Sequence, residues 1–291
     1  MNVFPSALDP LAVFSLGLVA WLYARGLAEI WRRAGGRKGL RGWEALCFGA
    51  GWLSLAVAVA SPLHPLGERL FSAHMAQHEM LILVAAPLLV LGRPLVAFLW
   101  AFPATARERV GEWAASRPVS AVWTTITGPL AVFLIHGLAL WLWHAPALYE
   151  AALRSDAIHL LEHASFFGSA ALFWWALIHG RYGRLGYGVA VFYVFATALH
   201  SGVLGALLTF APRVWYPIYA ERTVFWGLQP LEDQQLAGLI MWVPAGALFV
   251  AVGLCLFAAW LGESERRARM GETERLRRLW LEGAAEGGDG A

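Results

Sequence analysis

Residues 74–91, HMAQHEMLILVAAPLLVL, place two histidines, a glutamate and two methionines at the start of a long apolar run. The run continues to residue 102, which exceeds the roughly 20 residues that a helix needs to cross a bilayer. We therefore predict a membrane-spanning helix near 76–102. His74 and His78 are four residues apart, so on a helix they share one face. This spacing suits two ligands of one metal ion, but the end of any amphipathic helix can look the same. The positions of the other histidines decide between these two interpretations.

The composition indicates a polytopic membrane protein. Of the 291 residues, 59% are hydrophobic and 14% are charged, whereas soluble domains carry about 25% charged residues. Seven apolar runs are long enough to cross a bilayer, near residues 11–31, 43–62, 76–102, 119–145, 158–179, 187–210 and 235–261. We predict an all-α membrane protein with one seven-transmembrane helix bundle over 1–262 and a charged, partly helical tail over 263–291. Pro87 and Pro94 should kink or end parts of the third run, and Pro244 should kink the seventh.

Several classes of protein are excluded by charge and cysteine content. The net charge is +2 and the basic residues lie in short loops between apolar runs, so nucleic acid is not an expected partner. Cys47 and Cys255 both lie inside apolar runs, which argues against a thiol redox pair or a disulfide framework. The N-terminus lacks the basic segment of a cleavable signal peptide, so none is expected. The tail from Glu263 to Leu281 should form a short charged helix on the membrane surface.

The distribution of lysine and arginine predicts the orientation. The loops after the first, third and fifth runs and the tail hold most of them: Arg32, Arg33, Arg37, Lys38, Arg41, Arg93, Arg107, Arg109, Arg117, Arg181, Arg184, Arg266, Arg267, Arg269, Arg275, Arg277 and Arg278. The alternate loops hold only Arg69, Arg154, Arg213 and Arg222. Because loops rich in basic residues stay in the cytoplasm, we predict an outer N-terminus and a cytoplasmic C-terminus.

With this orientation, eight of the nine histidines fall in outer loops or in helices above the cytoplasmic side, and only His179 is cytoplasmic. Two pairs spaced by four residues enter from the outer side on different helices. Ionisable groups inside a membrane are costly and indicate function, so we predict a metal or cofactor site with two tiers of ligands. The rim tier contains His74, His144 and His159, with His64 as a further candidate, and the deeper tier contains His78, His163 and His200, with His136 as a further candidate.

The ligand types leave the metal open. Imidazole suits zinc, copper, iron and nickel, whereas a thioether is a soft ligand that favours Cu(I). Met75 and Met80 flank the first histidine pair and are further candidate ligands, although ordinary packing explains them equally well. Metal-bound histidines usually donate their second N–H to a carboxylate or carbonyl. Glu79, Glu162 and Asp233 are the candidate partners.

The segment HLLEH, His159 to His163, leaves a second chemistry open. It fits the inverzincin pattern H-x-x-E-H, in which two histidines hold zinc and the glutamate acts as a base. An intramembrane zinc-dependent hydrolase is therefore one alternative. Paired histidines could also be axial ligands in a haem-binding or haem-transfer protein. A third alternative is a scaffold that binds no metal and only docks its partner.

Five segments together resemble a known family: FSAHMAQHEMLILVAAPLLVLGRP (71–94), HGLALWLWHAPALYEAAL (136–153), HLLEHASF (159–166), HSGVLGALLTFA (200–211) and GLQPLEDQQLAGLIMWVPAG (227–246). Over roughly residues 43–261 the chain resembles the bacterial caa3-type cytochrome c oxidase assembly factors of the seven-helix CtaG type. The basic tail lies outside the resemblance. The histidines that match the family's motifs are His74, His78, His144, His159, His163 and His200.

The resemblance implies a multi-pass protein of the bacterial plasma membrane that is needed to assemble haem-copper oxidase. Together with the histidines it predicts that the chain binds copper, as Cu(I) or Cu(II), on the outer side and delivers it to the oxidase, with zinc as the alternative metal. The implied partners are the oxidase subunits, the lipid bilayer and an extracytoplasmic copper donor. No turnover chemistry is required, so we predict no catalytic residues and no enzyme activity.

Overall fold

The computed structural model describes residues 10–34, 39–179 and 187–286, and those residues form a helical bundle without strands. Predictions on Arg37, Lys38, Arg181 and Arg184 lie outside the described residues. The main helices are α1 (Pro10–Arg33), α2 (Gly42–Ala60), α4 (Phe71–Glu79), α5 (Ala86–Leu91), α8 (Arg117–Ile126), α9 (Pro129–Trp143), α11 (Asp156–His179), α13 (Tyr187–Thr209) and α14 (Pro230–Glu286). Short helices connect them: α3 (Leu63–Gly67), α6 (Pro94–Trp100), α7 (Ala104–Ala115), α10 (Pro146–Ala152), η2 (Pro217–Tyr219) and η3 (Val224–Trp226).

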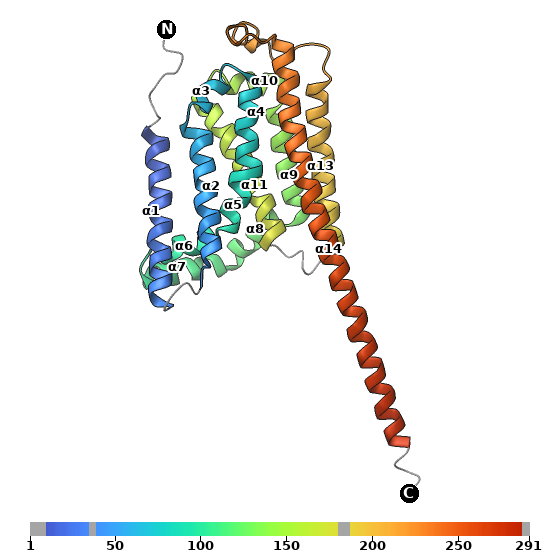
Figure 1. Cartoon of the computed structure of the whole chain (residues 1–291). Coiled ribbons are helices and arrows are strands. Elements are labelled where there is room, and N and C mark those ends of the chain that lie inside the picture. Colours follow the sequence, from blue (N-terminus) through green and yellow to red (C-terminus); the bar gives the residue numbers. More distant parts are fainter. Residues whose placement is uncertain (1–9, 35–38, 180–186, 287–291) are drawn as a thin grey trace.

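The bundle has two ends that differ in character. The short helices α3 and α10 and the connection between α13 and α14 lie at one end, called the α3–α10 end, and α6, α7 and α8 lie at the other (Figure 1). Leu53, Leu138, Leu199 and Val250 exemplify the large apolar side chains exposed around the helices. Such a surface suits lipid rather than water.

Five of the described helices, counting Phe71–Leu91 as one, are long and apolar enough to cross a membrane. The pair α8 and α9 makes a sixth if its bend is part of one span. Helix α11 has 24 residues and lies where the fifth span was predicted, inside the bundle, but it is not among these helices. The all-helical membrane class is thus confirmed, whereas the count of seven spans and the orientation stay predictions.

The predicted third span, 76–102, is shorter and starts earlier in the structure. It begins at Phe71 and ends at Leu91. Gly92 is followed by Arg93 in the left-handed conformation, φ 50° and ψ 51°, and Pro94 then opens α6. A residue before proline avoids the right-handed helical region, so the helix cannot continue through Arg93. Pro94 therefore ends this span, as predicted.

Pro87 changes the helix in another way. Residues Met80–Ala85 form a π-helix between α4 and α5. In that register the carbonyl of Ile82 would accept a hydrogen bond from residue 87, but proline has no N–H. Trp174 of α11 supplies the missing donor: its Nε1 donates to the Ile82 carbonyl oxygen at 2.9 Å. This bond ties α11 to the span that carries His74 and His78.

The fourth predicted span, 119–145, is bent by 62° between α8 and α9. Gly128 is extended, φ −67° and ψ 146°, directly before Pro129, the first residue of α9. The same constraint on a residue before proline explains the break.

Helices α13 and α14 pack closely because small residues face each other. A Cβ added at Gly238 would lie 2.6 Å from the Thr209 backbone nitrogen and 2.7 Å from the Gly205 carbonyl oxygen. Small residues at helix interfaces in membranes permit this approach. Gly205 of α13 likewise lies against α14, since a Cβ added there would lie 2.8 Å from Cβ of Trp242 and 3.2 Å from the Gly238 carbonyl oxygen.

The tail differs from its prediction. Helix α14 runs without interruption for 57 residues, from Pro230 to Glu286. Pro244 lies inside it and does not end it. The last span therefore continues in line as a rod that projects beyond the other helices (Figure 1), and no separate surface helix begins at Glu263.

Candidate metal centre

Four buried side chains from α4 and α11 converge near the α3–α10 end. His74, His78, Glu162 and His163 each offer one ligand atom, and these atoms lie within 4.8 Å of one another. Nε2 of His74 is 3.5 Å from Oε2 of Glu162, and Nε2 of His78 is 3.9 Å from its Oε1. His74 and Glu162 are both fully buried, at 0% exposure. We call these four residues the His–Glu group.

A second set, the three-His group, consists of His64, His159 and His163, again with ligand atoms within 4.8 Å. His64 comes from α3 and is half-buried, and its ring stacks on His159 with centroids 5.0 Å apart. The rings of His159 and His163 are 4.3 Å apart. His163 belongs to both groups, so the two sets of ligands are continuous.

The polar atoms of these groups lack ordinary partners. Both ring nitrogens of His74 and of His78 and both oxygens of Glu162 are buried without a hydrogen bond, as is Nε2 of His159 and of His163. One buried unsatisfied polar group costs about 1–3 kcal/mol, so a cluster of them needs a compensating charge. The ligands of one tetrahedral ion, bonded at about 2.0–2.2 Å, lie roughly 3.5 Å apart. The ligand atoms of each group, now within 4.8 Å of one another, would reach that spacing through side-chain movements of about 1 Å. The residues therefore fit a metal ion.

The local sequence explains how each helix presents its ligands. His74 and His78 on α4, and His159 and His163 on α11, are spaced by four residues and so share a face. The start of α4 is fixed from outside. Both oxygens of Asp233, in the first turn of α14, accept hydrogen bonds at this helix start: Oδ2 from Phe71 N at 2.6 Å, Oδ1 from Ser72 N at 3.2 Å and from the Ser72 hydroxyl.

Asp233 was predicted to support a histidine directly. In the structure both of its oxygens hold the N-terminus of α4, so it positions the helix that carries two ligands. Glu162 was also predicted as a supporting carboxylate, and it lies at ligand distance instead. Glu79 is half-buried, its Oε2 has no partner, and it belongs to neither group.

Sequence reasoning missed Gln77, which is fully buried between the two histidines of α4. Its Nε2 donates to the Ala58 carbonyl oxygen at 2.7 Å and lies 3.0 Å from Nδ1 of His64. The amide therefore orients the His64 ring. Its signal in the sequence was a polar residue three positions after His74, on the same side of the helix.

Three tyrosines and a phenylalanine close the site at the α3–α10 end, and they were also missed. We call Phe71, Tyr149, Tyr216 and Tyr219 the aromatic roof; each is at most 2% exposed. Tyr149 lies 5.1 Å from the His74 ring, and its hydroxyl is 2.8 Å from that of Tyr219. Tyr219 donates to Gly67 O at 2.9 Å and Tyr216 to His144 O at 2.7 Å. Burial raises the pKa of all three phenols above the ordinary value.

His144 lies beside the His–Glu group and contacts a methionine. Its Nδ1 is 2.6 Å from Leu140 O, and its Nε2 is 3.4 Å from the sulfur of Met75. Both side chains are buried. The His144 ring centroid is 6.5 Å from that of His78.

The remaining candidates lie apart from both groups. His136 contacts Ser169 Oγ at 3.1 Å, and the ring of His200 lies 5.3 Å from that of Phe133. The two predicted tiers therefore do not correspond to the groups: His74 pairs with His78 and His163, and His159 pairs with His64 and His163.

The structure describes no contact between the sulfur of Met80 and a histidine. His179 contacts Val90 O at 3.2 Å, at the far end of α11.

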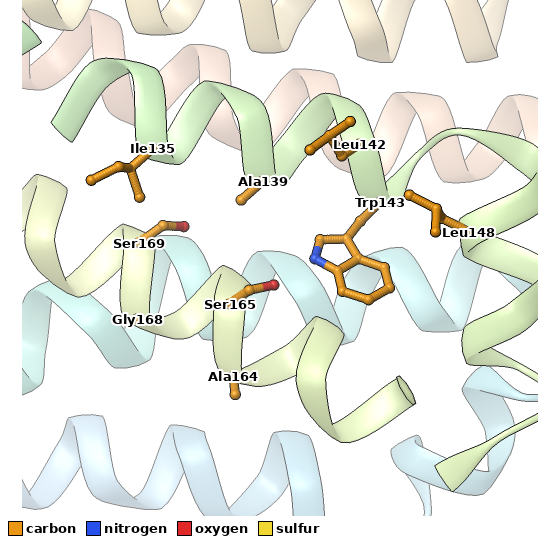
Figure 2. Close-up of a pocket in the computed structure, with 9 residues that line it drawn as sticks. All are labelled: Ile135, Ala139, Leu142, Trp143, Leu148, Ala164, Ser165, Gly168 and Ser169. Atoms are coloured by element: carbon orange, nitrogen blue, oxygen red, sulfur yellow. The ribbon is translucent and has the colours of Figure 1, made fainter. Parts of the chain in front are cut away.

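A separate recess lies between α9 and α11. Its volume is about 480 Å³, and it is lined by Ile135, Ala139, Leu142, Trp143, Leu148, Ala164, Ser165, Gly168 and Ser169. Figure 2 shows Ser165 and Ser169 of α11 opposite Ala139 and Trp143 of α9. No histidine or carboxylate lines it. It is an apolar feature and not part of the metal centre.

Comparison with known proteins gives one family match. The model of a family described as cytochrome c oxidase caa3 assembly factor (Caa3_CtaG) matches residues 21–263. Uncharacterized proteins of Mycobacterium bovis and Mycobacterium tuberculosis are each 28% identical over 255 residues, which cover 84% of this chain and 38% of theirs. One from Mycobacterium leprae is 26% identical over 75% of this chain and 34% of its own. The chain thus spans less than half the length of these relatives. No solved structure matches it significantly.

Proposed function

The chain belongs to the cytochrome c oxidase caa3 assembly factor family, and from that premise we propose that it binds copper on the outer side of the bacterial plasma membrane and delivers it to the haem-copper oxidase. Copper is the cargo and is released unchanged. The proposal requires no catalytic residue. Its partners are the oxidase subunits and an extracytoplasmic copper donor.

The observation that carries the proposal is the continuity of the two ligand groups through His163. A carrier must take up an ion and give it away, so its ligand sets should be close enough to exchange the ion. The three-His group includes half-buried His64, whereas His74 and Glu162 of the other group are fully buried. An ion that enters beside His64 can therefore pass inward while His163 stays bound.

The charge distribution supports the outer location. Arg69, Arg154, Arg213 and Arg222 are the described arginines that follow α3, follow α10 or lie in the connection between α13 and α14, all at the α3–α10 end. The opposite end, where α1 ends and where α2, α6, α7 and α8 begin, holds more of them: Arg32, Arg33, Arg41, Arg93, Arg107, Arg109 and Arg117. Under the positive-inside rule the α3–α10 end, with both histidine groups, faces away from the cytoplasm.

The test is the copper content of protein purified from copper-supplemented membranes. We expect the double variant His78→Ala, His163→Ala to lose most of its copper, because it removes a ligand from the His–Glu group and the residue shared by both groups. The matched control is His179→Gln, which changes a histidine at the far end of α11 and should retain copper. Equal copper in the double variant and the unaltered protein would refute the proposal.

A zinc-dependent hydrolase is the second candidate, and one observation favours it. Three histidines are a ligand set found in catalytic zinc sites. Two of the three-His group, His159 and His163, are also the histidines of the H-x-x-E-H motif, in which Glu162 would be the base. Retention of zinc over Cu(I), together with a hydrolytic activity lost in Glu162→Gln, would establish this function instead. A Soret band in the purified protein would favour the haem alternative.

A further inference from the structure

Met75 and His144 are two potential ligands that neither histidine group uses. We propose that they form a separate soft site for Cu(I), with His78 as a third ligand that the site shares with the His–Glu group. The inference rests on the proposed copper function, and it specifies the oxidation state and three of the ligands that hold the ion.

The first argument is the contact between Met75 and His144. Nδ1 of His144 faces the Leu140 carbonyl oxygen at 2.6 Å, and a carbonyl can only accept a hydrogen bond, so Nδ1 carries the proton. In the neutral ring Nε2 then bears a lone pair, and it points at the Met75 sulfur 3.4 Å away. A thioether has no proton to donate. Two electron-pair donors therefore face each other in a buried position, an arrangement that a bound cation stabilises.

The second argument is the distance. A nitrogen and a sulfur bound to one ion at about 2.0 and about 2.3 Å lie roughly 3.5 Å apart at a tetrahedral angle. The observed 3.4 Å between Nε2 of His144 and the Met75 sulfur matches this spacing. An ion held by both atoms would therefore have a bent nitrogen–metal–sulfur angle, which leaves room for a third ligand.

His78 is placed to be that ligand. Met75 and His78 are three residues apart on α4 and so lie on the same side of the helix. The centroid of the His78 ring is 6.5 Å from that of His144 and 5.2 Å from that of His163, so a small side-chain movement lets it share an ion with His144. Neither of its nitrogens has a hydrogen-bond partner. One ring can thus serve either site.

The two sites differ in the metal they prefer. The His–Glu group offers three imidazoles and a carboxylate, a set that suits zinc or Cu(II). The soft site offers one thioether and two imidazoles, and thioethers select Cu(I). Transfer through His78 would therefore favour copper over zinc at the point where the ion leaves the histidine groups.

The experiment compares Met75→Leu with Met80→Leu, in a background where Cys47 and Cys255 are changed to alanine so that no thiol binds copper. Leucine keeps the volume of methionine. Each protein is loaded anaerobically with Cu(I), and X-ray absorption at the copper edge reports sulfur neighbours. The affinities for Cu(I) and for Zn(II) are measured separately.

We expect a copper–sulfur distance in the parent and in Met80→Leu, and none in Met75→Leu. The Cu(I) affinity of Met75→Leu should fall by about 10- to 100-fold, while its Zn(II) affinity is unchanged. Cu(I) bound by nitrogen alone in the parent, or an unaltered Cu(I) affinity in Met75→Leu, would overturn the soft site and leave the copper proposal standing. A parallel loss of Zn(II) would assign Met75 a packing role instead. A parent protein that binds no copper would refute the proposed function itself.

Discussion

Glu162 is a fully buried carboxylate with two unpaired oxygens, held between His74 and His78. A cation bound there would compensate its charge, whereas the metal-free protein bears the cost of burying it. The residue thus favours metal binding at the expense of stability.

We predict that Glu162→Gln changes these two properties in opposite directions. In the presence of a chelator, the variant should be more stable than the parent by about 1–2 kcal/mol, because a neutral amide is cheaper to bury than a carboxyl group that must either stay charged or take up a proton. Its Zn(II) affinity should fall by about 10- to 100-fold. Thermal unfolding in detergent and metal titration measure the two effects. A variant that is less stable without metal would show that Glu162 has a structural partner.

The aromatic roof leads to a prediction about pH. Burial raises the pKa of Tyr149, Tyr216 and Tyr219, so the folded protein keeps these phenols neutral above their ordinary value of about 10. In the unfolded chain the same phenols ionise. Below about pH 10 they therefore do not alter stability, and above it stability is lost as the pH rises, because the unfolded chain binds fewer protons.

Ultraviolet titration tests this directly. At pH 11 at least three of the seven tyrosines should remain un-ionised in the folded protein and ionise when it is unfolded. Complete ionisation of the folded protein at that pH would show that the roof admits water.

Spacing within a helix predicted part of the site at the scale of the residue. The pairs His74 with His78 and His159 with His163 were predicted to share helix faces, and these faces meet. The sequence could not show which histidines meet across helices, because the rotation of one helix against another depends on packing. His136 and His200 were therefore assigned to a ligand tier although they contact Ser169 and Phe133.

At the scale of the element, α4 depends on a cap from a distant part of the chain. Asp233 binds both Phe71 and Ser72, across 162 and 161 residues of sequence. The carboxylate satisfies N–H groups that a helix start leaves unpaired and opposes the positive end of its dipole.

We predict that Asp233→Asn lowers stability by about 2 kcal/mol and also weakens metal binding, since α4 carries His74 and His78. Thermal unfolding and metal titration are the measurements. The control is Glu232→Gln, which changes an adjacent acid in the first turn of α14. Among the described residues, Glu232 accepts a hydrogen bond from Gln229 N, directly before its own helix, and none from α4. Equal effects of the two substitutions would mean that the charge at the start of α14 matters, and not the contact with α4.

The boundaries of the elements were harder to predict than their existence. Apolar runs located the helices, but the structure begins the third span at Phe71, whose N–H bonds to Asp233, and the turn at Arg93 and Pro94 ends it before residue 102. Likewise, Gly128 and Pro129 divide the fourth span. Hydropathy records none of these contacts and turns, so the apolar runs were continuous where the structure has breaks, although Pro94 was predicted to kink or end the third run.

At the scale of the whole molecule, the two ends of the bundle should face different compartments. In the background lacking Cys47 and Cys255, we predict that Arg154→Cys reacts with a membrane-impermeant thiol reagent added to intact cells and Arg109→Cys does not. Both side chains are exposed, so accessibility to water alone does not separate them. Labelling of Arg109→Cys alone would invert the orientation and place the metal centre on the cytoplasmic side.

Helix α14 begins with the turn that holds Asp233 and continues to Glu286, so it is a lever about 85 Å long at 1.5 Å per residue. Near its start, α14 contacts the first residue of α4 through Asp233, one turn before His74. A tilt of about 5° around that point would move the far tip by roughly 7 Å. A displacement of the start of α4 that tilted α14 as a rigid rod would therefore be enlarged at the far tip.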